Sequence, residues 1–156
     1  MGSKVYAIMA IGLMVVIPLV SVIAEFILTQ GADLLLLIGK WFTFWGIGAR
    51  LLIAGINQVV RPDFTATNIF GIKDPAARPI VTELGNANLA FGLIGILSLP
   101  FPGFLMPAAV AGGLFLALDG LLHIRSKDRS RNEMIALVTD LVVPIAVVIY
   151  LVGAVT

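Results

Sequence analysis

Five apolar stretches dominate this sequence, and each is about as long as a helix that crosses a bilayer. They cover residues 5–28, 34–60, 80–99, 104–124 and 134–155. A spanning helix needs about 20 mostly apolar residues, because each residue advances the helix by about 1.5 Å. Only 12% of the 156 residues are charged, against about a quarter in a soluble domain. The sequence therefore predicts an all-α, polytopic transmembrane helix bundle that forms one domain over residues 1–156.

Basic residues predict the orientation of this bundle. Eight of the ten Lys and Arg residues lie near the amino terminus or in the loops 61–79 and 125–133, while the other two, Lys40 and Arg50, lie inside the second span. Cytoplasmic loops carry an excess of Lys and Arg. We therefore expect a cytoplasmic amino terminus, cytoplasmic second and fourth loops, and a carboxyl terminus on the outside.

The first apolar stretch also has an alternative interpretation as a cleaved signal peptide. It is longer than a typical signal core, and "SVIAEF" is a poor cleavage site. Cleavage would leave four spans in the same orientation. Residues Met1 to Ser3 are either native or a remnant of cloning.

Most polar residues inside the spans fall in the half of the membrane nearest the cytoplasm. This predicted intramembrane cluster contains Arg50, Asn57, Glu83, Asn86, Asp119, His123 and Asp140. Residues three, four or seven apart share a helix face. A charge at the bilayer centre costs about 2.5 to 3.5 kcal/mol on insertion scales, so such residues normally face the bundle interior and pair. We expect Asp119, Asp140 or Glu83 to pair with Arg50.

Charged residues elsewhere suggest two weaker features. Glu25 and Lys40 flank the turn between the first two spans, where they could form an ion pair or each extend to the interface. The basic residues of the fourth loop would attract anionic headgroups or only anchor the helix ends, and they are Arg125, Lys127, Arg129 and Arg131. In the second loop, "NIFGIKDP" is expected to lie at the membrane surface and to bury Ile69, Phe70 and Ile72.

Glycine spacing predicts close packing of three consecutive spans. Gly48 and Gly55, Gly85 and Gly92, and Gly113 and Gly120 are each seven residues apart. Glycine at a two-turn repeat lets the backbones of neighbouring helices approach closely, although membrane helices are rich in Gly in any case. We interpret the three pairs as contact faces of a compact bundle.

Several classes of site are excluded by composition. The chain has no Cys and one His, so it offers neither thiolate ligands nor a histidine cluster for a metal. It also lacks a phosphate loop, a nucleophile elbow and a cofactor fingerprint. We expect no metal, no nucleic-acid partner and no enzyme activity.

Two motifs resemble the DoxX-like families of small bacterial membrane proteins. They are "ARLLIAGINQVVRPDF" in the second span and "ELGNANLAFGLIGILSL" in the third. The resemblance covers the second to fifth spans and implies a bacterial inner membrane protein, whose relatives have been linked to thiosulfate and quinone oxidoreduction. Those families typically have four spans, so the additional first span and the long second loop point to a separate subgroup.

Three hypotheses about function follow. In the first, the bundle is a non-catalytic subunit or accessory of a membrane assembly, in contact with lipid and with another membrane protein or further copies of itself. In the second, a quinone, a lipid or another small lipophilic molecule binds among the inner polar residues, and His123 relays protons. In the third, a homo-oligomer transports protons or a small solute, with Pro144 loosening the fifth span.

Overall fold

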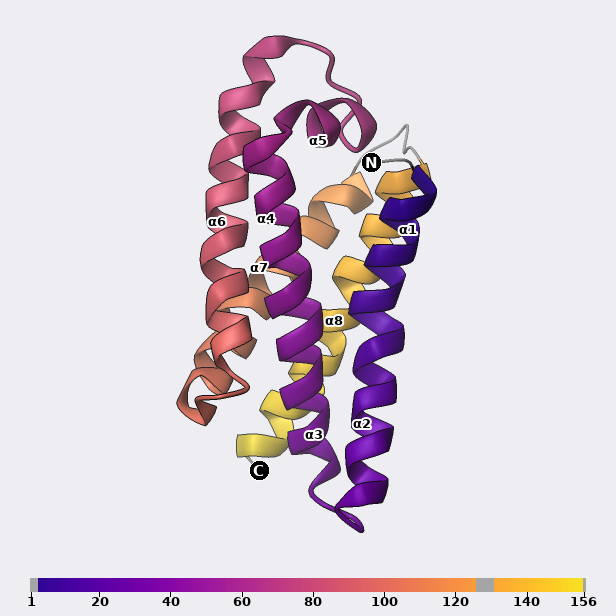
Figure 1. Cartoon of the computed structure of the whole chain (residues 1–156), viewed down its shortest axis with the longest axis vertical. Coiled ribbons are helices and arrows are strands. Elements are labelled where there is room, and N and C mark those ends of the chain that lie inside the picture. Colours follow the sequence, from indigo (N-terminus) through magenta and orange to yellow (C-terminus); the bar gives the residue numbers. More distant parts are fainter. Residues whose placement is uncertain (1–2, 126–130, 156) are drawn as a thin grey trace.

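The computed structural model describes residues 3–125 and 131–155, and within them the chain is helical without strands (Figure 1). Five helices of this described part are long and apolar enough to cross a membrane. They are Lys4–Leu28, Leu34–Val60, Pro75–Leu97, Pro102–Arg125 and Arg131–Ala154. The first is made of α1 (Ser3–Ile11), η1 (Gly12–Val16) and α2 (Ile17–Leu28), and the second of α3 (Leu34–Trp41), η2 (Phe42–Ala49) and α4 (Arg50–Val60). The other three contain α6 (Arg78–Leu97), α7 (Leu105–Arg125) and α8 (Arg131–Val155). The five helices match the predicted apolar stretches closely.

The two chain ends lie at opposite ends of the bundle (Figure 1). We call the end with the amino terminus and α5 (Pro62–Asn68) the amino-terminal end. The loop predicted between the second and third spans contains this short helix and the single turn η3 (Pro75–Ala77). A similar turn, η4 (Pro102–Phe104), precedes α7. Proline suits the first turn of a helix, because the backbone N–H groups there have no partner within the helix and proline lacks this group.

The turn between the first two long helices is formed by residues suited to a chain reversal and a helix start. The chain reverses through Gln30 (φ 54°) and Gly31 (φ 99°), both in the left-handed region, which glycine adopts without steric cost. The Asp33 carboxylate then accepts hydrogen bonds from the backbone N–H groups of Leu35 (2.9 Å) and Leu36 (3.3 Å). These bonds satisfy orphan donors at the start of α3.

Both amino-terminal spans contain a π-helical segment, η1 and η2, and the two segments pack against each other. A π-helix has a wider turn than an α-helix and is frequent at functional sites. The η2 segment is largely buried and ends at Ala49, so the regular helix resumes at Arg50. The register of Arg50 is therefore set by an irregular, tightly packed segment.

Glycines form the contact between the second span and α6. A Cβ added to Gly48 would lie 2.7 Å from the Gly95 carbonyl carbon, and one added to Gly55 would lie 2.7 Å from the Gly85 oxygen. Gly92 likewise packs against the backbone of the second span. The glycine faces of these two spans therefore pack directly against each other.

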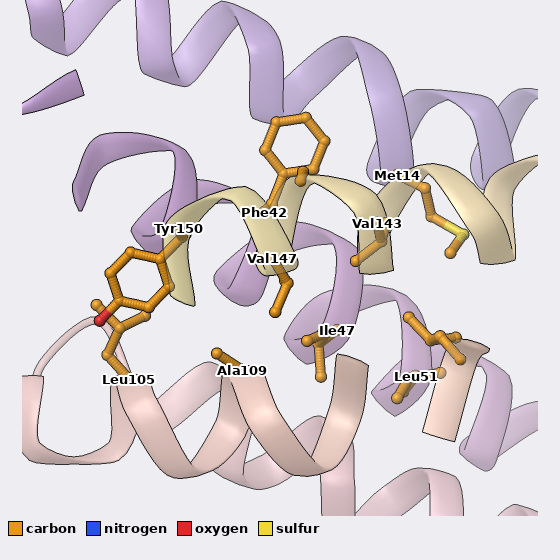
Figure 2. Close-up of a cluster of buried hydrophobic side chains, with 11 residues drawn as sticks. Met14, Phe42, Ile47, Leu51, Leu105, Ala109, Val143, Val147 and Tyr150 are labelled. Carbon is orange, nitrogen blue, oxygen red and sulfur yellow. The ribbon is translucent and has the colours of Figure 1, made fainter. Parts of the chain in front are cut away.

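An apolar core fills the half of the bundle away from the amino-terminal end. Figure 2 shows Val143 and Val147 of α8 pointing toward Ile47 of η2 and Ala109 of α7. The other members of the core cluster are Met14, Phe42, Leu51, Leu105, Leu116, Ala146 and Tyr150. Polar side chains instead gather in the amino-terminal half, and these form the candidate site.

Candidate functional site: a polar cavity around Arg50

A cavity of about 130 Å³ lies inside the amino-terminal half of the bundle. It is similar in size to an apolar cavity of about 150 Å³ that holds one benzene molecule. The cavity receives side chains from α1, α4, α5, α6, α7 and α8. Its polar wall is made by Tyr6, Arg50, Gln58, Thr65, Asn88, Asp119, His123 and Asp140.

Arg50 faces this cavity, as expected, but its nearest polar partner is a tyrosine. The guanidinium donates a 3.4 Å hydrogen bond from Nη2 to the Tyr6 hydroxyl, and its Cζ lies 5.7 Å from the centre of the Tyr6 ring. That distance suits a cation–π contact. Among the described residues no carboxylate lies within 4.0 Å of Arg50, so the predicted direct pairing with Asp119, Asp140 or Glu83 is wrong.

The physical reason is that Tyr6 of α1 lies against the guanidinium, while Asp119 and Asp140 lie elsewhere on the cavity wall. Arg50 Nε is buried and has no hydrogen-bond partner. A charge without a close partner inside a membrane is expensive. Asp119 and Asp140, on the same wall, stabilise the Arg50 charge electrostatically across the cavity. The Arg50 Nε–H is still available to another hydrogen-bond acceptor.

His123 is buried rather than lying at the interface, with only 6% of its surface exposed. Its Nδ1 lies 3.3 Å from Glu133 Oε1, and its Nε2 lies 3.9 Å from Asp140 Oδ2. The imidazole also stacks on Phe70, with ring centres 6.1 Å apart and planes 18° apart. His123 therefore joins α7 to two carboxylates of α8 and to the loop that follows α5.

The sequence interpretation missed the pairing of Gln58 with Asn88. Asn88 Nδ2 donates a 2.6 Å hydrogen bond to Gln58 Oε1, and both side chains are buried. Asn88 Oδ1 is buried without a partner. The glycine spacing could have predicted that Asn88 faces α4, because Asn88 lies three residues after Gly85 and four before Gly92. It thus shares the glycine face that packs on α4.

Two predicted members of the cluster, Glu83 and Asn86, lie outside it. Both are exposed on the outer face of α6. The glycine face of α6 packs on α4, and Glu83 and Asn86 lie off that face, on the side of the helix turned away from the bundle. Asn57 donates a 2.9 Å hydrogen bond to the Ile53 carbonyl and lines a separate cavity of about 40 Å³ beside Arg50.

A wider cavity of about 340 Å³ opens at the amino-terminal end, and we call it the mouth. Its wall contains Phe70, Ile72, Leu122, His123, Arg125 and Glu133. Phe70, Leu122 and His123 also line the 130 Å³ cavity, so the two spaces adjoin at these side chains. In the second loop, Ile69 and Phe70 are half-buried against the bundle and Ile72 is 46% exposed, so burial of these side chains in the membrane surface stays a prediction.

The remaining predicted residues lie away from the cavity. Lys40 Nζ donates hydrogen bonds to Glu25 Oε1 (2.7 Å) and Oε2 (2.8 Å), and Trp41 Nε1 donates a 2.6 Å bond to Oε2, so the structure contains the ion pair suggested by the sequence. Arg125 and Arg131 are exposed at helix ends. The other two basic residues of that loop, Lys127 and Arg129, lie outside the described residues. No group of three His, Asp or Glu side chains in the described ranges could hold a metal ion.

The fold and the cavity define a class: a small, all-helical protein with five apolar helices suited to a membrane and a polar cavity between them. The chain belongs to a family of unknown function, DUF6790, whose sequence profile matches residues 4–155. Comparison with curated proteins and with solved structures gives no match. The family match shows no link to the DoxX-like families, so that resemblance stays a prediction.

Proposed function

We propose that this integral membrane protein binds a small neutral molecule in the cavity around Arg50. One observation carries the proposal. Arg50 Nε and Asn88 Oδ1 are both buried without a partner, and both residues line the same cavity. An unsatisfied buried group costs about 1 to 3 kcal/mol, and more if charged. A ligand with an acceptor for Arg50 and a donor for Asn88 would remove both penalties.

Charge on the cavity wall favours a neutral ligand. Arg50 contributes one positive charge, while Asp119 and Asp140 contribute two carboxylates. The wall has no excess of positive charge when both carboxylates are ionised, so an anion gains little there. A carbonyl or ether oxygen can accept from Arg50, and a hydroxyl can donate to Asn88. A quinol carries such hydroxyls, whereas the ring of the quinone suggested by the sequence has acceptors only.

Size limits what the inner cavity can hold. A volume of about 130 Å³ accommodates a group of about one ring. Any longer apolar tail has to leave through the mouth, where Phe70, Ile72 and Leu122 form the apolar part of the wall. Ligand sites in helix bundles commonly combine such apolar walls with a few polar groups.

The test is mass spectrometry of organic extracts from protein purified gently out of its native membrane. The informative variant is Arg50→Gln, and the matched control is Arg61→Gln, which removes an exposed arginine at the end of α4. We expect a stoichiometric neutral molecule in the wild type and in the control, and its loss from Arg50→Gln. Equal recovery from both variants, or extracts without any such molecule, would overturn the proposal.

The exposed face of α6 supports a second candidate function, that of a subunit in a larger membrane assembly. Glu83 and Asn86 lie within a helix suited to a membrane, yet both are exposed. Polar groups facing lipid lack hydrogen-bond partners, and a neighbouring helix can supply them. We expect Asn86→Leu to reduce the size of the complex extracted in mild detergent. The control is Asn68→Leu, which changes an exposed asparagine of α5 outside the spans, and an unchanged complex in Asn86→Leu would reject this candidate.

A further inference from the structure

Three titratable residues form a row from the mouth to the inner cavity. Glu133 lines the mouth, Asp140 lines the inner cavity, and His123 lines both. The two acids lie seven residues apart on one face of α8, so about 10 Å of helix separates them. His123 reaches between them from α7, with Nδ1 3.3 Å from Glu133 and Nε2 3.9 Å from Asp140.

The row is largely closed to solvent. His123, Glu133 and Asp140 are each 7% exposed or less. Phe70 covers the imidazole by stacking on it, and the loop after α5 contributes only the apolar side chains Ile69, Phe70 and Ile72 to the two cavities. Between the mouth and the inner cavity, these two carboxylates and one imidazole are therefore aligned as successive proton carriers.

We propose that Glu133, His123 and Asp140 form a proton pathway between the mouth and the cavity around Arg50. The role of this pathway rests on the proposed binding function: it would let the bound molecule gain or lose a proton without opening the bundle. It does not depend on which molecule binds there, because the row is present in the protein itself.

The transfer conserves protons and involves no electron transfer. The Glu133 carboxyl gives a proton to His123 Nδ1, and the imidazolium then releases its Nε2 proton toward Asp140. An imidazole suits this role because one of its two ring nitrogens can accept a proton while the other releases one. The first gap, 3.3 Å, allows a long hydrogen bond. The second, 3.9 Å, needs either a small approach of Asp140 or one bridging water, for which the cavity has room.

Charged groups from several helices face the imidazole and will affect this transfer. The charged residues that line the same two cavities as His123 are Glu133 and Asp140 of α8, Asp119 and Arg125 of α7, and Arg50 of α4, and the neutral Tyr6 phenol of α1 lines the inner cavity with them. Beyond Asp140 the bundle is closed by the core residues Val143, Ile47 and Leu116, which are 0%, 0% and 2% exposed. The pathway therefore ends in the cavity and does not cross the membrane.

The experiment is an infrared-detected pH jump on the full chain in lipid nanodiscs, without added ligand. The carboxyl stretch of Asp140 is assigned as the band that disappears in Asp140→Asn. We expect His123→Gln to slow the response of this band about 100-fold, which is within the usual contribution of a positioned acid–base group. Glu133→Gln should also slow it, and the double variant should be no slower than His123→Gln, since both residues lie in one series.

The matched control is Asp63→Asn, which changes an exposed aspartate of α5 and should leave the rate unaltered. Thermal unfolding of each variant checks the fold, and Glu133→Gln still tests the pathway if His123→Gln does not fold. Equal rates in the wild type and in the folded row variants would overturn the proposal, as would an Asp140 band that does not respond to pH. Proton flux across the membrane of vesicles that contain the wild-type protein would overturn the inference that the pathway ends in the cavity. Ligand binding is tested separately, by mass spectrometry of organic extracts from the Arg50→Gln variant.

Discussion

The contact between Gly48 and Gly95 leads to the sharpest stability prediction. A Cβ added to Gly95 would lie 2.5 Å from both Cα and N of Gly48. Carbon atoms normally pack about 3.5 to 4.0 Å apart. These Gly48 atoms are backbone and cannot rotate away, so Gly95→Ala has to push η2 and α6 apart by about 1 Å.

The expected cost follows from two opposing terms. Overpacking a closely fitted contact costs about 1 to 3 kcal/mol, and replacing Gly by Ala inside a helix returns up to about 1 kcal/mol of helix propensity. Because the added Cβ meets backbone atoms, the overpacking cost lies near the upper end of this range, about 3 kcal/mol, and we expect Gly95→Ala to lower the free energy of unfolding by about 2 kcal/mol. The separation should also weaken the Asn88–Gln58 hydrogen bond, because it joins the same two spans.

The assay is reversible unfolding in mixed micelles, with Gly12→Ala as the matched control. A Cβ at Gly12 would meet nothing within 4 Å, so this change should be neutral or should stabilise the protein by less than about 1 kcal/mol. The reasoning would be refuted if Gly95→Ala were as stable as the wild type, or if both variants lost equal stability.

Three further predictions concern polar contacts and orientation. Asn88→Leu should destabilise the protein by about 1 to 3 kcal/mol, because it leaves the buried Gln58 amide without its partner; unfolding of Gln58→Leu and of the double variant shows whether the loss is shared. A double-mutant cycle of Glu25→Gln and Lys40→Gln should give a coupling of only about 0.2 to 1 kcal/mol, since both side chains are about a quarter exposed, and a coupling above about 3 kcal/mol would contradict this. Reporter tags should place the carboxyl terminus outside and the second loop in the cytoplasm, and a cytoplasmic carboxyl terminus would disprove the predicted orientation.

The polar residues of α6 show what sequence patterns can and cannot predict. Hydropathy predicts the helix well, yet it does not distinguish Glu83 and Asn86, which lie on the outer face, from Asn88, which is buried. Periodicity says which residues share a face, but not which face is turned inward. The glycines settle this question in the structure, because Gly85, Gly92 and Gly95 contact the second span and bring Asn88 with them.

Arg50 shows a second limit. Its place in an apolar helix predicted correctly that it faces the interior, since exposure of a charge to lipid is costly. Its partner could not be predicted, because Tyr6 is 44 residues away and belongs to a different span. The π-helical segment η2 also changes the register just before Arg50, and a regular helical repeat does not anticipate this.

The sequence by itself determined the all-helical class, the bounds of the five apolar helices and the inward position of Arg50, because the cost of exposing polar backbone and charge in lipid depends on each segment alone. Only the tertiary structure decided that Arg50 meets Tyr6, that Asn88 meets Gln58, and that His123 lies between Glu133 and Asp140. These contacts join different helices, so they depend on how each helix is rotated and shifted against its neighbours. Side-chain packing across the whole bundle sets that arrangement.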